Sequence, residues 1–213
     1  MKITFISDTH NKHEDLILDT GDILVHCGDL THRGSRKDVL KFAKFIAKQK
    51  FKHKIVIAGN HDFCFEDDRK EEAQAYFTDH GIIYLNDSGA EIDGIKFWGS
   101  PIQPEYHDWA FNKKRGEEIK KHWDYIPEDT DILITHGPPY GILDRCHNGE
   151  SVGCEELLKR VREIAPQIHA FGHIHEDYGV MDLDGTKFIN ASSLNIKYEY
   201  QNPPISIQVG VST

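Results

Sequence analysis

Short apolar runs recur along the chain, and polar stretches separate them. The runs are four to six residues long and rich in β-branched and aromatic side chains, which is typical of buried strands. They span residues 2–7, 22–27, 54–58, 82–85, 95–99, 131–135, 168–171, 186–190 and 205–209. The pattern therefore predicts a fold with many short strands.

Two longer stretches have apolar residues at helical spacing. Ser35 is placed to cap a helix that runs to about Gln49. A second helix is predicted to begin near Cys154, and Pro166 ends it. Strands that alternate with helices predict an α/β layered fold. Since the chain has 213 residues, we interpret residues 1–213 as a single domain.

Composition narrows the class of protein. The chain is 38% hydrophobic and 28% charged, as in an ordinary globular protein. No apolar run approaches the roughly 18 residues that a membrane helix needs, and the apolar start of the chain is too short for a signal peptide. The four cysteines form no Cys-x-x-Cys pair and are expected to be free thiols. These features predict a cytoplasmic protein without a membrane partner.

The formal charge of −10 bears on the choice of substrate. Proteins that grip a nucleic-acid backbone usually carry a stripe of Lys and Arg, and this chain has no basic run. Long duplex nucleic acids are therefore excluded as expected partners. A small phosphate ester stays possible because bound divalent ions would supply positive charge where it docks.

Polar side chains that can bind metals follow the predicted strands. In open α/β sheets, ligands bind beyond the carboxyl ends of the strands, so these residues are expected to meet there. They come after five different strands, as Asp8 and His10, Asp29, Asn60 and His61, His136, and His173 and His175. Gly28, Gly59 and Gly172 each directly precede one of them, where a close backbone approach would leave no room for a Cβ.

These residue types suit a pair of divalent metal ions. Imidazole and carboxylate groups suit Mn, Fe and Zn, and a carboxylate such as Asp29 can bridge two ions. Asn60 can bind through its neutral carbonyl oxygen, and His136, His173 and His175 would complete the two shells. Two ions can clamp a phosphoryl group while a hydroxide between them attacks phosphorus in line with the leaving oxygen. His61 is then placed to protonate the leaving group, with Asp62 orienting its ring.

Each of these motifs could also have a purely structural role, which has to be weighed against the metal site. The chain has 14 histidines, and a single histidine is usually a structural or solvated residue. Asp8-x-His10 alone is a weak signal, and Gly59-Asn60-His61-Asp62 is stronger. The five pieces in this order, each after a strand, favour the metal site.

With these motifs, the sequence resembles the calcineurin-like metallophosphoesterase superfamily. Its blocks Asp-x-His, Gly-Asp, Gly-Asn-His, Gly-His and Gly-His-x-His are all intact between Asp8 and His175. The resemblance implies a four-layer α/β/β/α sandwich of two mixed β-sheets flanked by helices, and it makes His61 the catalytic histidine. It also implies two ligand sets, which are Asp8, His10, Asp29 and His175 for one metal and Asp29, Asn60, His136 and His173 for the other.

Further stretches resemble one branch of that superfamily, the metallophosphoesterase-domain-containing proteins, which are related to class III cyclic-nucleotide phosphodiesterases. They include Gly99-Ser100-Pro101-Ile102-Gln103-Pro104 and Thr135-His136-Gly137-Pro138-Pro139. A third stretch is Asp108-Trp109-Ala110-Phe111-Asn112. Its Trp109 and Phe111 are expected to anchor the core rather than to stack on a base. Arg145 and His147 lie in a loop from which they could reach a phosphate.

The predicted function is thus a dinuclear metal-dependent phosphodiesterase that hydrolyses small phosphodiesters such as cyclic nucleotides. The expected cofactors are two divalent ions, with Mn²⁺ the first choice and Fe, Zn, Co or Mg also accepted by such ligands. Two alternatives stay open: a phosphomonoesterase or protein phosphatase with the same metals, and a non-catalytic scaffold that keeps the fold. The sequence names no substrate-binding residue and no oligomeric state.

Overall fold

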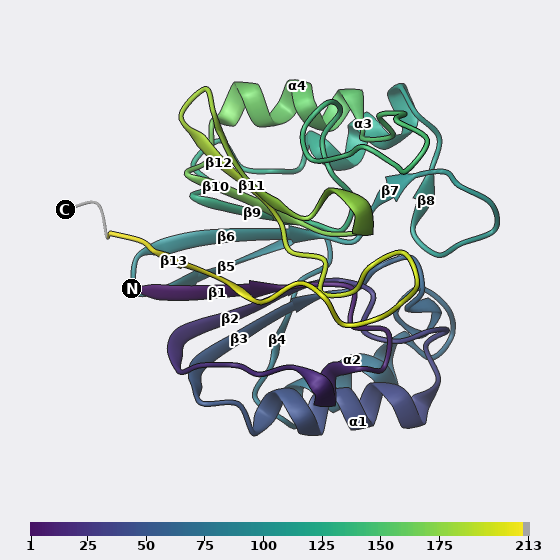
Figure 1. The fold of residues 1–213 in the computed structure, drawn as a ribbon, viewed down its shortest axis with the longest axis vertical. Helices are drawn as coiled ribbons and strands as arrows, with labels where there is room; N and C mark the ends of the chain where they lie inside the picture. The colour runs from purple at the N-terminus through teal and green to yellow at the C-terminus, as the bar shows by residue number, and fades with distance from the viewer. Residues whose placement is uncertain (211–213) are drawn as a thin grey trace.

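Two mixed β-sheets pack face to face in the computed structural model, and helices cover the outer face of each (Figure 1). The structure describes residues 1–210, so the end of the predicted domain, 211–213, lies outside the described residues. The strands are β1 (Lys2–Ile6), β2 (Gly21–Cys27), β3 (Phe51–Ile57), β4 (Ile83–Tyr84), β5 (Ser88–Ile92), β6 (Ile95–Ser100), β7 (Gln103–Pro104), β8 (Asn112–Lys113), β9 (Ile132–Thr135), β10 (Ile168–Phe171), β11 (Gly179–Leu183), β12 (Thr186–Asn190) and β13 (Ile205–Gln208). The helices are α1 (Arg36–Ala47), α2 (Lys70–Thr78), α3 (Glu117–Trp123) and α4 (Glu155–Ile164), with short 3₁₀ turns at His13–Asp15, Phe63–Phe65 and His175–Asp177.

The order of the strands brings the first and the last strand together. The first sheet has the order β13-β1-β2-β3-β4, and the second has the order β11-β12-β10-β9-β6-β5. Within each sheet the central strands are parallel, whereas β13, β11 and β5 are antiparallel to their neighbours. Because β13 returns to pair with β1, the last strand lies beside the first in Figure 1. The carboxyl ends of the parallel strands therefore gather at one edge of both sheets.

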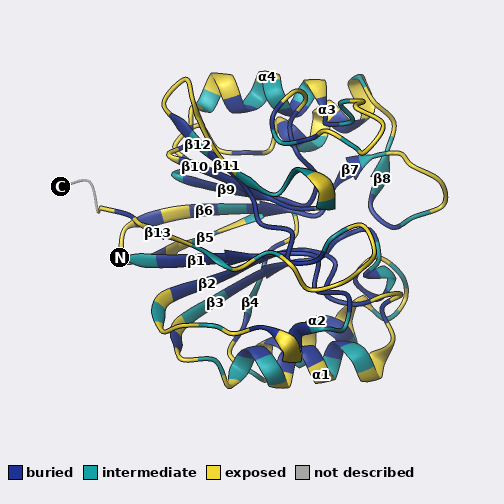
Figure 2. Cartoon of the chain, viewed as in Figure 1, coloured by how far each residue is buried: buried dark blue, intermediate teal, exposed yellow. Residues whose placement is uncertain are grey.

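Alternating side chains explain why the sheets form three apolar layers. In β2, Ile23, Val25 and Cys27 join the core between the two sheets, while Leu24 points to the helical side. There it belongs to the cluster that contains Phe42 of α1. Strands buried on both faces read as continuous apolar runs, which is why they were visible in the sequence. Figure 2 shows the result, with buried strands in the middle and exposed residues on the outer surface of the helices.

The two predicted helices are present with the expected ends. The Ser35 hydroxyl accepts a hydrogen bond from the Asp38 backbone N–H at 3.2 Å and caps α1. Helix α4 ends at Ile164, where Ala165 takes a left-handed conformation one residue before Pro166. All nine predicted strands are also present, although β3 begins at Phe51, three residues before the predicted start. The predicted four-layer sandwich is confirmed, and α2, α3, β5, β7, β8 and β11 are additions to the prediction.

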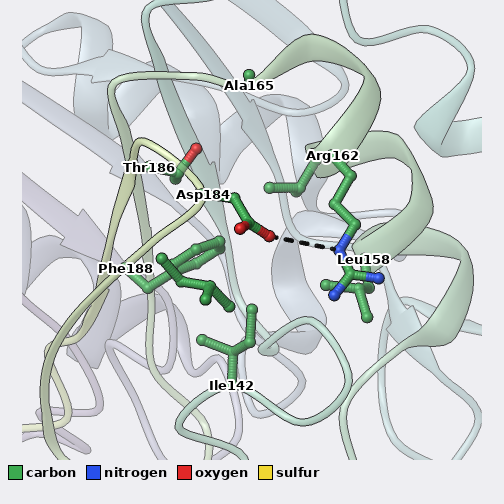
Figure 3. Close-up of a pocket in the computed structure, with 9 residues that line it drawn as sticks. Ile142, Leu158, Arg162, Ala165, Asp184, Thr186 and Phe188 are labelled. Carbon is green, nitrogen blue, oxygen red and sulfur yellow. Dashed lines mark ion pairs between the residues drawn. The ribbon is translucent and has the colours of Figure 1, made fainter.

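A hollow of about 220 Å³ lies between α4 and the turn that joins β11 to β12 (Figure 3). Its lining is mainly apolar, and the Arg162 Nε and Asp184 Oδ2 atoms point toward each other at 4.0 Å. Thr186 in this lining begins β12, whereas the carboxyl end of that strand is Asn190. The hollow is therefore at the opposite end of the sheet from the predicted site.

The cysteines are free thiols, as predicted, and Cys27, Cys64 and Cys154 are buried. Among the described residues, no helix is long and apolar enough to cross a membrane.

Candidate metal centre

The predicted ligands converge where the strand ends of the two sheets meet. Asp8, Asp29 and Asn60 follow β1, β2 and β3 of the first sheet, whereas His136 and His173 follow β9 and β10 of the second. Asp8 links the two groups, because its Oδ2 accepts hydrogen bonds from the His173 backbone N–H at 2.9 Å and from the Ser192 hydroxyl at 3.0 Å. The sheet edge thus assembles side chains that are up to 167 residues apart in the chain, from Asp8 to His175.

Asp29 is at the centre of the cluster. Its Oδ2 lies 3.4 Å from His136 Nε2, 3.6 Å from His10 Nε2 and 3.9 Å from His61 Nε2. Its Oδ1 accepts the backbone N–H of His61 at 2.9 Å. This carboxylate is nearly fully buried, so several imidazole rings are its main polar neighbours.

Side-chain atoms group on both sides of Asp29. One ligand atom each from Asp8, His10 and His175 lies within 4.8 Å of the others, and the same holds for Asp29, His136 and His173. Asn60 belongs to the second group, because its Oδ1 is 2.8 Å from His136 Nε2. A third such group, His10, Asp29 and His61, shares His10 with the first group and Asp29 with the second. The structure therefore brings all seven predicted ligands into one cluster.

Backbone carbonyls fix the orientation of two of the rings. His136 Nδ1 lies 2.9 Å from the Cys27 carbonyl oxygen, and His175 Nδ1 lies 3.1 Å from the Asn195 carbonyl oxygen. A carbonyl can only accept, so each Nδ1 carries the proton and each Nε2 is turned toward the carboxylates. Metal-binding histidines are commonly held in this way, since the second hydrogen bond sets the tautomer.

The backbone is strained at several of these residues. Asp8, His10, Asp29 and His173 have φ angles of 53°, 39°, 56° and 69°. Left-handed conformations are uncommon for residues other than glycine and cost free energy unless the surroundings impose them. Such strain is concentrated at functional sites, and here it falls on four predicted ligands.

Two motif glycines leave room for the cluster. A Cβ on Gly172 would lie 2.1 Å from Asp8 Oδ2, and a Cβ on Gly59 would lie 2.3 Å from Asp29 Oδ1. Real Cβ atoms essentially never come within 3.0 Å of such neighbours. The close approach predicted from the sequence is therefore present at both glycines.

The electrostatics of the cluster suit cations. Burial raises the pKa of Asp8, but His175, to which it is hydrogen-bonded, and the other nearby histidines outweigh it and hold that pKa well below its usual range. Burial lowers the pKa of His136 and of His175, yet the neighbouring carboxylates raise both to about 9. Two buried carboxylates here need positive charge, and protonated histidines supply it when nothing else does.

His10 gives the most direct test of whether metals fit. Burial lowers the pKa of His10 to about 4, despite the nearby carboxylates of Asp29 and Asp8. Both of its ring nitrogens are buried, and neither has a hydrogen-bond partner among the described residues. An unpartnered buried imidazole is costly unless something else uses its lone pair. A cation next to Asp29 and Asp8 would do so, and we conclude that the residues present fit divalent ions.

His61 lies at the cluster and faces the cavity above it, but its surroundings correct one prediction. Asp62 was expected to orient the His61 ring; instead, His61 Nδ1 lies 2.9 Å from the His32 carbonyl oxygen. Both Asp62 oxygens accept hydrogen bonds from the neighbouring loops, from Leu30 N–H, Thr31 N–H, the Thr31 hydroxyl and Gly59 N–H. Asp62 therefore joins the loops after β2 and β3, which carry Asp29 and Asn60, because its carboxylate is turned into the protein.

A cavity of about 280 Å³ opens over the cluster. Its floor is formed by the predicted residues His10, Asp29, Asn60, His61, His173 and His175, and its walls by Tyr106, Trp109, Glu176, Ile196 and Tyr198. Phe111 is a buried core residue as predicted, whereas Trp109 stacks on His61 with ring centroids 4.2 Å apart. Of the described residues that line the cavity, none is Arg145 or His147. Of these wall residues, only Trp109 lies in a stretch that the sequence marked, and there it was expected to be a core anchor.

Comparisons with known proteins agree with this geometry. A sequence model of the family described as "Calcineurin-like phosphoesterase" matches residues 1–177. The chain belongs to the calcineurin-like phosphoesterase family. Human "Metallophosphoesterase domain-containing protein 1" is 39% identical over 228 residues, which cover 96% of this chain and 69% of the human protein. A UPF0046 protein of Caenorhabditis elegans is 37% identical and covers all of this chain and 77% of its own length.

Solved structures support the fold alone. TT1561 of Thermus thermophilus superposes with a TM-score of 0.64 at 14% identity, covering 89% of this chain and 88% of its own. Membership of this family implies that the protein is a phosphoric ester hydrolase. Hydrolases of this family use divalent metals. The clusters around Asp29 are its candidate metal-binding residues.

Proposed function

We propose that the protein is a dinuclear metal-dependent phosphodiesterase that hydrolyses small phosphodiesters. The observation that carries the proposal is the position of Asp29, whose Oδ2 lies 3.6 Å from His10 Nε2 of one side-chain group and 3.4 Å from His136 Nε2 of the other. One ion would be held by Asp8, His10, Asp29 and His175, and the other by Asp29, Asn60, His136 and His173. When bound, two divalent ions, with Mn²⁺ the first choice for such mixed ligands, would neutralise the phosphoryl oxygens and acidify an attacking water.

The protein's own residues would then position the ester and handle its proton. His61 lines the cavity, and its Nδ1 proton is engaged by the His32 carbonyl. The proton that leaves with the departing oxygen therefore has to come from Nε2, which is the nitrogen nearer to Asp29. Trp109 covers the His61 ring from the side of the cavity wall and restricts its rotation. His61 is thus the proposed general acid of the reaction.

The charge of the cavity favours diesters over monoesters. The described residues that line it include no Lys or Arg, and they include the carboxylate of Glu176. A monoester carries close to two negative charges at neutral pH, whereas a diester carries one. Apart from the ions, little in this cavity would offset the second charge, and Glu176 would repel it. Cyclic nucleotides are within this substrate class.

The test uses metal-stripped protein to which Mn²⁺ is returned stepwise. We expect hydrolysis of bis(p-nitrophenyl) phosphate that depends on Mn²⁺ and exceeds that of p-nitrophenyl phosphate in kcat/KM. His61→Ala should lower diester turnover by about 10²–10⁴-fold while Mn²⁺ still binds. His147→Ala is the matched control, because that ring is exposed and outside the cavity. Faster hydrolysis of the monoester would favour a phosphomonoesterase, and bound Mn²⁺ without any turnover would favour a scaffold.

A further inference from the structure

Large apolar side chains stand exposed at the walls of a cavity whose floor is polar. Tyr106 is 59% exposed, Ile196 is 54% exposed and Tyr198 is 37% exposed. All three line the cavity above His10, His61 and the other candidate ligands. Exposed apolar side chains that gather at a concave site commonly mark a binding surface. The floor explains how a phosphoryl group binds, and these walls need a separate explanation.

The loop that carries Tyr198 and Ile196 is built to hold them in place. Asn195 Oδ1 accepts the backbone N–H groups of Lys197 and Glu199 at 2.9 Å and 3.0 Å. The Asn195 carbonyl accepts the Tyr198 N–H at 2.8 Å, and Lys12 Nζ donates to the Tyr198 carbonyl. These bonds fix the position of the loop relative to the segment after β1.

Tyr198 itself is strained by this arrangement. Its φ is 58°, a left-handed conformation that is unfavourable for a bulky aromatic residue. A glycine or an asparagine at position 198 could make the same backbone hydrogen bonds with less strain. The tyrosine at this position therefore indicates a role for its side chain. Backbone strain of this kind is concentrated at ligand clamps.

The Tyr198 ring lies against His10 and His175, two members of one candidate metal-binding group. Its centroid is 4.8 Å from the His10 ring and 5.4 Å from the His175 ring. A group attached to a phosphoryl centre bound there would touch Tyr198 and Ile196 before it reached solvent. The second wall, with Tyr106, comes from the loop between β7 and β8, which reaches the same side of the molecule in Figure 1.

The volume of the cavity is compatible with a ring of modest size. A cavity of about 150 Å³ lined by apolar side chains holds one benzene molecule. At about 280 Å³, the cavity here has room for a phosphoryl group and one flat ring. A flat ring also fits the chemistry of the walls, because aromatic faces bind it by stacking or edge contacts.

We propose that Tyr198, Ile196 and Tyr106 form a subsite for a flat aryl or heteroaryl ring carried by the phosphoester. The subsite rests on the proposed phosphodiesterase function and names the class of substrate: phosphoesters with a ring next to phosphorus, rather than simple alkyl esters. Aryl and heteroaryl esters share this chemistry.

The test measures binding rather than turnover and uses two probes that cannot be hydrolysed. Methyl(phenyl)phosphinate and dimethylphosphinate both carry a single negative charge, as a phosphodiester does, so the ratio of their dissociation constants reports the ring alone. Titration calorimetry is carried out on Mn²⁺-loaded protein. We expect methyl(phenyl)phosphinate to bind about 10-fold more tightly than dimethylphosphinate, as ring stacking generally provides. Ile196→Ala and Tyr198→Ala should each bring this ratio toward one.

Two further variants separate the ring subsite from a general loss of structure. Tyr198→Phe keeps the ring and should keep the ratio. Tyr125→Ala removes a tyrosine that is 64% exposed and lies outside the cavity, and it should also keep the ratio. Equal dissociation constants for the two probes in the parent protein, or a ratio that both alanine variants leave intact, would overturn the subsite and leave the proposed function standing. Failure of both probes to bind the Mn²⁺-loaded protein would overturn the proposed function and the subsite together.

Discussion

Replacing Gly172 by alanine is expected to disable the metal centre although it adds a single methyl group. The backbone at Gly172 is not left-handed, so alanine suits its φ, and only the space around the new Cβ matters. That atom would lie 2.1 Å from Asp8 Oδ2 and 2.2 Å from Ser7 Oγ. Ordinary contact begins at 3.4 Å, so Asp8 and residue 172 would have to separate by more than 1 Å.

The surroundings of Asp8 determine how large the effect becomes. Asp8 is fully buried and is held by the His173 N–H and the Ser192 hydroxyl, so it has no free space into which to move. Overpacking of this kind costs about 1–3 kcal/mol of stability. A displacement of about 1 Å at a catalytic centre commonly costs about 10²-fold in rate, and a disturbed ligand loses about 10–100-fold in metal affinity.

Gly137 offers a matched control. It also adjoins a candidate ligand, His136, but a Cβ there would find its nearest neighbour, Gln103 Cβ, at 4.0 Å. Gly137→Ala should therefore bind Mn²⁺ and hydrolyse bis(p-nitrophenyl) phosphate much as the parent protein does. Calorimetric titration with Mn²⁺ and steady-state turnover of both variants form the assay. If Gly172→Ala keeps the Mn²⁺ affinity of the parent protein, then either Asp8 is not a ligand or the close packing at Gly172 is not needed.

Three other perturbations have definite expected outcomes. Removing the metal with a chelator should lower the melting temperature, because ions at 100 times their Kd stabilise the folded state by about 2.7 kcal/mol. An unchanged melting curve would contradict a metal site in the native protein. Ser192→Ala removes the hydroxyl that donates to Asp8, so Mn²⁺ affinity should fall by about 10-fold in a calorimetric titration, and equal affinity would show that this hydrogen bond is dispensable. Burial lowers the pKa of His169 to about 3 in the folded protein, compared with about 6.5 in the unfolded chain. As the pH falls below about 6.5, only the unfolded chain protonates this histidine, so the free energy of unfolding should fall by about 2 kcal/mol by pH 5. His169→Gln, compared with the exposed His147→Gln in urea melts at pH 7.5 and pH 5, should remove that loss, and parallel changes in the two variants would refute it.

The strands and the ligands were predictable for the same physical reason. Parallel strands buried on both faces produce apolar runs, and the polar residue that ends such a run must lie at the sheet edge. Asp29 after β2 and His136 after β9 are examples, since each directly follows a run of buried residues. The sequence therefore predicted the sheet and the polar residues that gather at its edge.

The additional elements have weak sequence signals because little of each is buried. Helix α2 buries only Ala73 and Phe77, and α3 buries only Ile119 and Trp123, so neither shows a long apolar period. Strand β11 is at the edge of its sheet, and four of its five residues are exposed, so it has no alternation to detect.

Contacts made by backbone groups and by distant loops could not be predicted at all. The group that orients His61 is the His32 carbonyl, and every residue has a carbonyl, so no side-chain pattern marks it. The sequence favoured Asp62 because it is the next residue, but the two side chains after β3 turn in different directions. Tyr198 reaches the site only because Asn195 and Lys12 fix its loop, and those contacts depend on the tertiary structure.

Divalent ions at the proposed metal centre would also help to hold the two sheets together at their polar edge. Apolar packing between Val25, Ile57, Ile134 and Ala170 joins the sheets along most of their length. At the edge that packing gives way to buried carboxylates and imidazoles, which would repel or lose hydration if they were left alone. Asp8 crosses this gap by accepting the His173 N–H, but the cluster around Asp29 still needs positive charge between the sheets. Divalent ions placed there would bind ligands from both sheets at once, so catalysis and the cohesion of this edge would depend on the same atoms.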